Sequence, residues 1–176
     1  MFENIKADMA RYVQYGGWYR QLGFWITLVY RYGFWAINLN SIIFRTILRI
    51  LYLFIVMPVR FFHYVHIPVR AVIGPGLLLV HPHMILFPKG VILGESCTVY
   101  HDVTLGLGPI DGVPRLADNV VVFPGARVLG GVTIGEHAHL GANTVVLRDV
   151  DPGATVMIQQ RTIPSNIIKR NTEVGG

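Results

Sequence analysis

The chain has 176 residues, enough for one compact domain with an appendage. Hydrophobic residues make up 52% of it, a high share for a soluble protein, and the formal net charge is +5. The basic residues are spaced through apolar sequence and do not cluster as they would to follow a phosphate backbone, so we expect no nucleic-acid binding. The single cysteine, Cys97, excludes a disulfide within the chain and favours a reducing compartment.

The front of the chain, residues 1–62, differs from the rest in charge and in aromatic content. Up to Arg70 there are eight Lys or Arg against two acids, whereas the remainder carries seven against eight, so the net excess of +5 comes from the front. The three tryptophans also lie there. We therefore expect an N-terminal α-helical, amphipathic segment over residues 1–62.

The clearest helix in this segment is predicted from Ser41, a capping residue, to Met57, with Pro58 ending it. Arg45 and Arg49 share one side of it, and nearly all its other residues are Ile, Leu, Phe, Tyr or Val. No uncharged apolar run reaches the ~18 residues expected of a membrane-spanning helix.

Two interpretations fit this segment. In the first, the helices lie on a membrane, with Arg toward anionic headgroups and aromatic rings in the interface. In the second, their apolar sides cap the repeats or pack in an oligomer, and Arg11, Arg20 and Arg31 form a solvated face. Much aromatic surface would remain after one side packs, so we favour membrane contact through residues 10–60. The first four residues lack the basic start of a secretory signal, which predicts a cytoplasmic protein, peripheral on the cytoplasmic face of the inner membrane.

The second part of the chain repeats with a strict period of six. A first row of positions is aliphatic throughout, and the residue four places after each one is small or β-branched. The first row is Leu116, Val122, Val128, Ile134, Leu140 and Val146, and the second is Val120, Ala126, Val132, Ala138, Thr144 and Val150. This period matches neither a helix nor a hairpin sheet and is typical of a solenoid of short parallel strands.

The same rhythm continues upstream through Leu93, Val99 and Leu105, with Cys97 at an inward position. Between Leu105 and Leu116 the count slips by five residues, so a Gly- and Pro-rich loop must project there. Loops on rigid scaffolds often carry function, and we expect this one to help build a ligand site.

The run from Ile73 to Gly106 contains His81 in the stretch Leu-Leu-Leu-Val-His and ends in Val-Thr-Leu-Gly. Gly-Ala-Arg-Val-Leu-Gly (residues 125–130) and Leu-Gly-Ala-Asn-Thr-Val-Val-Leu (residues 140–147) follow. Together these motifs resemble the hexapeptide-repeat acyltransferases, especially the serine O-acetyltransferase branch and the colanic-acid-type exopolysaccharide acetyltransferases, over about residues 67–163. The resemblance implies an all-β left-handed parallel β-helix, a homotrimer, and acetyl transfer from acetyl-CoA to a hydroxyl between subunits.

By the same resemblance, His81 would be the general base, because an imidazole titrates near neutral pH and can take the hydroxyl proton during attack on the thioester. His83 and His101 would face the same cleft and bind acceptor hydroxyls, and His66 is a third candidate for binding the acceptor. Cys97 need not be a nucleophile, since no acyl-enzyme is required. What orients His81 stays open between His66 and a backbone carbonyl.

Departures from the serine branch concern its charged groups. In that branch a carboxylate directly precedes the catalytic His, and this chain has Val80 there instead. A second His of the branch is replaced by Val113, and the Arg before it by Gly112. A further carboxylate of the branch is replaced by His66. A zwitterion against Val80 and Val113 would leave charges unpaired, at a cost of roughly several kcal/mol. We therefore expect a neutral sugar hydroxyl as acceptor, on carbohydrate or a lipid-linked sugar.

For the acyl donor, the resemblance places the pantetheine arm beside the projecting loop, along Pro124, Gly125, Gly141 and Ala142, where backbone amides could polarise the thioester carbonyl. The same small residues also suit solenoid corners. Past the last coil only Arg161 matches the family, and the resemblance implies that it would face the CoA phosphates. The histidines have no Cys or carboxylate partners at ligand spacing, so no metal is expected.

The sequence thus predicts a helical segment (residues 1–62), a left-handed β-helix acyltransferase domain (63–163) and a tail (164–176). The predicted function is acetyl-CoA-dependent O-acetylation of a sugar in bacterial surface or exopolysaccharide biosynthesis. Two alternatives are kept: serine O-acetyltransferase of cysteine biosynthesis, and a non-catalytic hexapeptide-repeat scaffold that binds no CoA.

Overall fold

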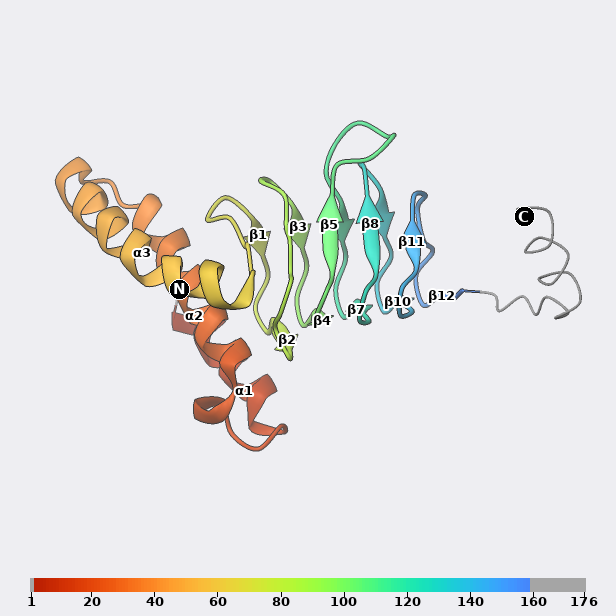
Figure 1. Ribbon diagram of the computed structural model, residues 1–176, viewed down its shortest axis with the longest axis horizontal. Coiled ribbons are helices and arrows are strands. Elements are labelled where there is room, and N and C mark those ends of the chain that lie inside the picture. The colour runs from red at the N-terminus through yellow and green to blue at the C-terminus, as the bar shows by residue number, and fades with distance from the viewer. Residues whose placement is uncertain (1, 159–176) are drawn as a thin grey trace, which may run out of the picture.

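A computed structural model describes residues 2–158. Three α-helices and a short 3₁₀ helix lie at one end of a solenoid of short parallel strands, and the last strand lies at the other end (Figure 1). The predicted left-handed parallel β-helix with an N-terminal helical segment is confirmed.

The solenoid has three flat faces, and every strand pairing within them is parallel. The first face contains, in spatial order, β1 (Val72–Ile73), β3 (Ile92–Leu93), β6 (Arg115–Leu116) and β9 (Thr133–Ile134). The second contains β2 (Leu78–Val80), β4 (Thr98–Tyr100), β7 (Val121–Val122), β10 (His139–Leu140) and β12 (Thr155–Val156). The third contains β5 (Thr104–Gly106), β8 (Arg127–Leu129) and β11 (Val145–Val146).

The period-six rows form the core, as predicted. All six aliphatic residues of the first row are buried, from Leu116 to Val146, and so are the first five of the second row, while Val150 packs against them partly buried. Each coil places one aliphatic side chain per face into the interior, so the three faces close around a narrow apolar core.

The corners use residues with positive φ. Asparagine, aspartate and histidine recur there, as at Asp102 (φ 55°), Asn119 (φ 58°) and Asn143 (φ 57°), because short polar side chains tolerate the left-handed region. The five-residue excursion projects between β5 and β6, where the third face meets the first (Figure 1), and its residues Leu107 and Ile110 are exposed.

The helices are α1 (Phe2–Val13), η1 (Trp18–Arg20), α2 (Leu22–Ile37) and α3 (Ile42–His63). Ser41 precedes α3 as predicted, although its side chain makes no capping hydrogen bond. The expectation that Pro58 ends this helix is wrong, because α3 continues through Pro58 to His63. Proline removes one backbone donor but leaves the following turn free to form. The helix ends instead at Tyr64, which has a left-handed conformation.

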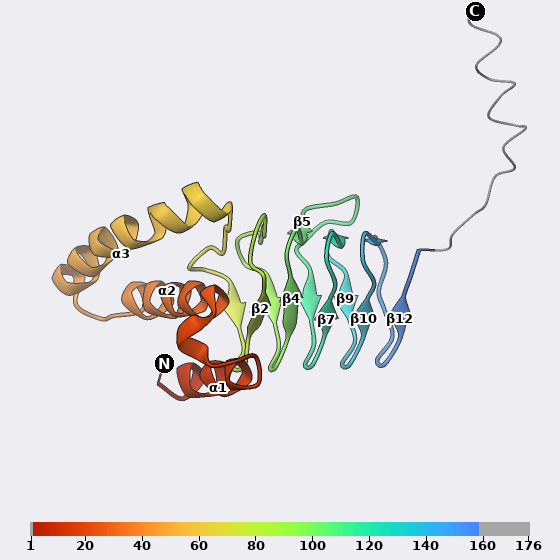
Figure 2. The same ribbon diagram turned by 60° about the horizontal axis from the view of Figure 1, so that its bottom comes forward.

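α1 and α2 cover the open end of the first coil (Figure 2). Arg31 of α2 and Asp8 of α1 form a buried ion pair, with Nε–Oδ2 at 2.9 Å and Nη2–Oδ1 at 3.0 Å. Arg31 also donates to the carbonyls of Ile73 and Gly74, each at 2.6 Å, and Asp8 accepts the amide of Leu77 at 2.9 Å. Arg31 is therefore not on the solvated face where the packing interpretation placed it.

Two tyrosines extend this cap along the same edge. The Tyr12 hydroxyl accepts the amide of Leu79 at 2.8 Å, and the Tyr30 hydroxyl donates to the carbonyl of Ala71 at 2.8 Å. Burial is the main cause that raises the pKa of both tyrosines to about 12. The helices thus supply partners for the peptide groups of β1, β2 and their flanks, which would otherwise form an open sheet edge.

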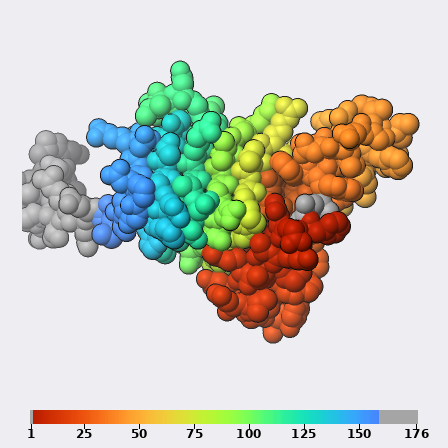
Figure 3. All heavy atoms as spheres, turned by 180° about the vertical axis from the view of Figure 1, so that it is seen from behind, coloured from red at the N-terminus to blue at the C-terminus, as the bar shows by residue number. Residues whose placement is uncertain are grey.

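α3 differs from α1 and α2, because most of its surface is exposed (Figure 3). Its 22 residues include an 18-residue window of mean hydropathy 2.1, which is long and apolar enough to cross a membrane. The expectation that no uncharged apolar run reaches about 18 residues still holds, because Arg45 and Arg49 interrupt the helix. These charges do not lower the mean hydropathy of the helix enough for it to fail a test of length and composition. By length and composition alone, α3 passes the test for a spanning helix.

Candidate active site

Most of the predicted site residues lie along one edge of the solenoid, between the second and third faces. We call this edge the histidine corner; it comprises His81, His83, His101, Pro124 and Ala142. Successive coils are joined there by backbone hydrogen bonds, which place the last four residues in one column. These bonds are Asp102 N–H to His83 O (2.7 Å), Gly125 N–H to His101 O (3.2 Å) and Asn143 N–H to Pro124 O (2.9 Å).

His81 lies on a two-residue bulge at this corner. Val80 pairs with Tyr100 on one side of it and Leu86 bridges Thr104 on the other, so six sequence steps in the first coil (80 to 86) oppose four in the next (100 to 104). The two additional residues are His81 and Pro82. His81 is exposed and has φ 50°, a left-handed conformation. A protruding corner imidazole of this kind is well placed to meet a ligand that lies along the edge.

A further histidine, His63, joins the corner from the last turn of α3. Its ring lies 5.0 Å from that of His83, and its carbonyl accepts the amide of Met84 at 3.0 Å. The Nδ1 atoms of His63 and His101 are buried and have no hydrogen-bond partner within residues 2–158. Sequence reasoning missed His63, because it precedes the repeats and carries no motif of its own. In the described part of the chain, no group of three or more His, Cys, Asp or Glu is arranged to hold a metal ion.

An ion pair on the third face fixes the corner backbone. Arg127 Nη2 lies 3.0 Å from Asp102 Oδ1, and Nη1 donates to the carbonyls of Asp102 and Gly125, the latter at 3.0 Å. Both side chains are about one-third exposed, so the pair adds little to stability. Its effect is geometric, since it ties together two coils at the residues that follow His101 and Pro124. Nothing in the repeat pattern singled out either side chain.

His66 is not part of the corner. It bridges Leu86 in the ladder of the third face, three residues past His63. Burial, together with the positive charge of Arg60, lowers the pKa of His66. No hydrogen bond among the described residues joins the His81 ring to His66 or to a backbone carbonyl, so neither candidate for orienting His81 holds it here. Arg161 lies outside the described residues.

The predicted donor-binding positions follow His101 along the same edge. Gly125 has φ 75°, a left-handed conformation that favours glycine, and an added Cβ would also displace the exposed Asn143 side chain. Two of the amides expected to polarise a thioester already donate hydrogen bonds. The Gly125 amide donates to the carbonyl of His101, and the Gly141 amide donates to the carbonyl of Val156 at 2.8 Å. Pro124 has no amide hydrogen. The amide of Ala142 has no backbone acceptor within residues 2–158, which leaves it as the available donor.

The projecting loop lies at a different edge from His81. It joins β5 of the third face to β6 of the first, whereas His81 follows β2 of the second face. Val113, at the end of the loop, therefore lies at a different edge of the solenoid from His81 of the same chain. Within one chain the loop does not lie beside the donor-binding positions, so a site that uses both elements requires a second chain.

Cys97 is fully buried, as its inward position predicted. Its Sγ lies 3.3 Å from the carbonyl of Ala117, and burial raises the pKa of the thiol to about 11. The thiolate, which is the reactive form, is thus strongly disfavoured in the folded chain. Cys97 belongs to the core and does not face the histidine corner.

We expect native Cys97 to react with iodoacetamide at pH 8 at least about a hundredfold more slowly than in the urea-unfolded chain, because the thiolate fraction falls tenfold per unit rise in pKa. The folded thiol stays protonated, while the unfolded thiol ionises above about pH 9, so this group should also lower stability between pH 9 and 11. Mass spectrometry of timed samples measures the rates; equal rates in the two states would contradict the burial.

The later coils and about half of the chain are similar in sequence to known transferases. Residues 114–148 match the family "Bacterial transferase hexapeptide (six repeats)". The serine acetyltransferase of Synechococcus elongatus is 41% identical over 102 residues, which is 56% of this chain and 40% of that protein. The serine acetyltransferase of Helicobacter pylori strain J99 is 39% identical over 101 residues, 56% of this chain and 59% of the relative.

Solved structures give the same result for the fold. A serine acetyltransferase in complex with CoA has a TM-score of 0.72 at 24% identity, covering 86% of this chain and 64% of the other. The Neisseria gonorrhoeae serine acetyltransferase in complex with serine has a TM-score of 0.69 at 26% identity, covering 88% and 65%.

These relatives overturn the prediction of a sugar acceptor in exopolysaccharide biosynthesis. The named relatives are serine acetyltransferases, which was the stated alternative. The prediction rested on Val80 and Val113, and such local substitutions weigh less than similarity over about a hundred residues. The chain spans about half the length of the curated relatives it matches.

The period-six core, the histidine at the bulged corner, the family match within the later coils and the shared fold all point the same way. Residues 114–148 match the bacterial hexapeptide transferase family, about half of the chain is similar in sequence to serine acetyltransferases, and most of it shares their fold.

Proposed function

We propose that this protein is an acetyl-CoA-dependent O-acetyltransferase whose acceptor is L-serine. The observation that carries the proposal is the placement of His81, on an exposed bulge at the head of a column that continues into Pro124 and Ala142. The similarity to serine acetyltransferases, including one solved with CoA and one with serine, supports both substrates.

The chemistry needs one base and one oxyanion donor. His81 takes the proton of the serine hydroxyl while the hydroxyl oxygen attacks the thioester carbonyl carbon. The carbon–sulfur bond then breaks, the acetyl group stays on the serine oxygen, and the CoA sulfur leaves with the proton that His81 had accepted. The amide of Ala142, which has no backbone acceptor within residues 2–158, is a donor that could stabilise the carbonyl oxygen as it gains charge.

We also propose that the working form is a homotrimer. The prism has three edges, and the histidine corner and the projecting loop lie at two of them. Three copies packed around a threefold axis can bring the loop of one chain against the histidine corner of its neighbour. Assembly would then complete a site that a single chain leaves open on one side.

A steady-state assay of CoA release tests the function. The full-length protein should release CoA from acetyl-CoA in the presence of L-serine, with formation of O-acetylserine seen by mass spectrometry. The apolar Val80 beside His81 leaves a charged end of serine without a partner, so we expect a high KM for serine. The scaffold alternative predicts no CoA binding at millimolar CoA; that result would overturn the proposal.

A bulky side chain at Ala142 should block the donor. Ala142 is exposed and lies at the corner, so Ala142→Phe adds volume along the edge without entering the core. We expect the affinity for CoA, measured by calorimetry, to fall at least about tenfold, since a well-packed contact contributes more than 1.4 kcal/mol. Glu136→Phe is the matched control, because Glu136 is exposed at the equivalent position of another corner, just before the left-handed His137. Equal affinities in both variants would argue against a donor site at the histidine corner.

A further inference from the structure

The outward face of α3 is apolar, which is the reverse of an ordinary surface helix. The side of α3 that packs against the protein is a stripe at helical spacing, formed by Arg45, Leu48, Tyr52, Val56, Val59 and His63. The opposite side exposes Ile, Leu, Met and Phe side chains along the whole helix, with Phe54 74% and Phe61 73% exposed. The other large exposed residues are Ile42, Ile43, Phe44, Ile47, Ile50, Leu51, Leu53, Ile55, Met57 and Phe62.

This apolar surface extends beyond α3. A pocket of about 420 Å³ between α1, α2 and α3 is lined by Ile5, Trp25, Leu28, Val29, Tyr32 and Ile55. Trp25 remains 45% exposed at its rim. A contiguous apolar patch of this extent on a soluble surface marks an interaction site rather than ordinary surface variation.

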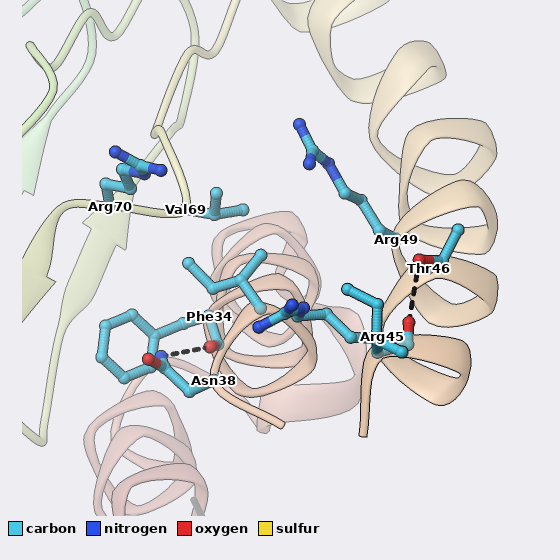
Figure 4. Close-up of a pocket in the computed structure, with 9 residues that line it drawn as sticks. Phe34, Asn38, Arg45, Thr46, Arg49, Val69 and Arg70 are labelled. Carbon is cyan, nitrogen blue, oxygen red and sulfur yellow. Dashed lines mark hydrogen bonds between the residues drawn. The ribbon is translucent and has the colours of Figure 1, made fainter. Parts of the chain in front are cut away.

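A basic pocket opens at the border of the same patch. It has a volume of about 570 Å³ and lies between the end of α2, the first half of α3 and the segment that leads into the first coil (Figure 4). Arg45, Arg49 and Arg70 line it, together with Asn38 and Thr46 and with apolar side chains such as Phe34 and Val69. No carboxylate lines this pocket, and within residues 2–158 none of the three arginines forms a salt bridge.

Three guanidinium groups around one cavity select for a phosphate. Arginine presents parallel N–H donors that match phosphate oxygens, and it stays charged at all physiological pH values. Ile42 belongs both to the pocket lining and to the exposed apolar face. An occupant of the pocket would therefore have an apolar surface beside its anionic group, which is the geometry of a phospholipid at the edge of a bilayer.

We propose that α3 lies in the surface of an anionic membrane and that the pocket of Arg45, Arg49 and Arg70 binds the phosphate of a lipid headgroup. The apolar face of α3 enters the boundary between headgroups and acyl chains, and the arginines meet the headgroup layer. In this proposal α3 lies parallel to the membrane plane and does not span the bilayer. Spanning would move Arg45 and Arg49 into the hydrocarbon core, at a free-energy cost of roughly 2.5–3.5 kcal/mol each.

Two other occupants fit less well. A second copy of this chain would bring one basic face toward another, because residues up to Arg70 carry eight basic and two acidic side chains. The phosphates of CoA belong near the donor positions Pro124 to Ala142, whereas this pocket lies at the helical end, before the first strand.

Vesicle co-sedimentation of the full-length protein tests the proposal. Mixed phosphatidylcholine–phosphatidylglycerol vesicles should bind the protein more tightly than phosphatidylcholine alone, and added salt should weaken the difference. Replacing Arg45, Arg49 and Arg70 together by Gln should lower binding to the mixed vesicles about a hundredfold, because each basic residue near an anionic surface contributes roughly fivefold. The matched control replaces Lys89, Arg115 and Arg148, three exposed basic residues of the solenoid, by Gln.

The apolar half of the proposal has its own variant. Phe54→Ser and Phe61→Ser together should weaken binding to both kinds of vesicle while leaving the circular-dichroism spectrum unchanged, since both side chains are largely exposed. Equal loss in the arginine variant and its charge control would show a nonspecific charge effect and overturn the headgroup pocket. If glycerol phosphate binds as tightly as the vesicles, the ligand of the pocket is a free phosphate. If the protein associates through α3 without lipid, the partner of the apolar face is a second copy of this chain. Either result contradicts the lipid proposal. These readouts do not depend on acetyl transfer.

Discussion

Replacing His81 by asparagine is expected to lower kcat for acetyl transfer by roughly a hundred- to ten-thousand-fold, the usual contribution of a positioned general base. Asparagine is chosen because it tolerates the left-handed conformation that His81 adopts at φ 50°. His81 is exposed and packs into no core, so the fold, the assembly and the affinity for CoA should stay as in the wild type. Single-turnover release of CoA in the presence of serine measures the chemical step directly.

His137→Asn is the control for this experiment. His137 is also an exposed histidine in the left-handed region, at φ 59°, but it lies at a different corner of the prism. Its replacement should leave kcat unchanged. Similar losses in both variants would show that His81 acts through structure and is not the base.

The solenoid could be predicted from the sequence because its core repeats. Every sixth residue from Leu116 to Val146 is aliphatic and buried, so each coil supplies the same signal again and errors at single positions average out. The position of the projecting loop followed from the same count, since an interrupted period marks an insertion. His81 was found through its resemblance to a family motif and not through the period.

The corner chemistry could not be read from the period, which reports only inward side chains. The two-residue bulge at His81 and Pro82 becomes visible only once the strand register is known. His63 reaches His83 from a helix with no repeat, and Arg127 is tied to Asp102 across 25 residues of sequence. Such contacts depend on which coils are neighbours, and a single sequence does not contain that information in its local patterns.

The helical segment shows the opposite problem. Its composition predicted helices and excess apolar surface, but not which helix would pack. α1 and α2 carry the polar groups that match the open edge of the first coil, above all Asp8, Tyr12 and Arg31, and are held there. α3 brings no such groups to that edge and keeps its apolar face outward. The capping interpretation therefore holds for α1 and α2, whereas membrane contact stays a prediction, now confined to α3.

The second large effect is expected at this cap. Asp8→Ala should lower the free energy of unfolding by about 3–5 kcal/mol, because it leaves Arg31 charged and buried, with side-chain exposure of 4%, and without its partner. It also removes the acceptor of the Leu77 amide, which then lies buried without a hydrogen bond. Urea unfolding followed by circular dichroism at fixed protein concentration measures the change.

Glu3→Ala provides the comparison on the same helix. Glu3 pairs with Lys6 at 3.1 Å, but their side chains are 85% and 72% exposed, so this variant should change stability by less than about 0.5 kcal/mol. The double replacement Asp8→Leu with Arg31→Met should recover much of the loss in Asp8→Ala, since it removes both charges and fills the space. The carbonyls of Ile73 and Gly74 would remain without their donor, so recovery should be incomplete. A loss in Asp8→Ala no larger than in Glu3→Ala would mean that the helices do not cap the first coil in solution, because only a docked α1 keeps Asp8 away from water.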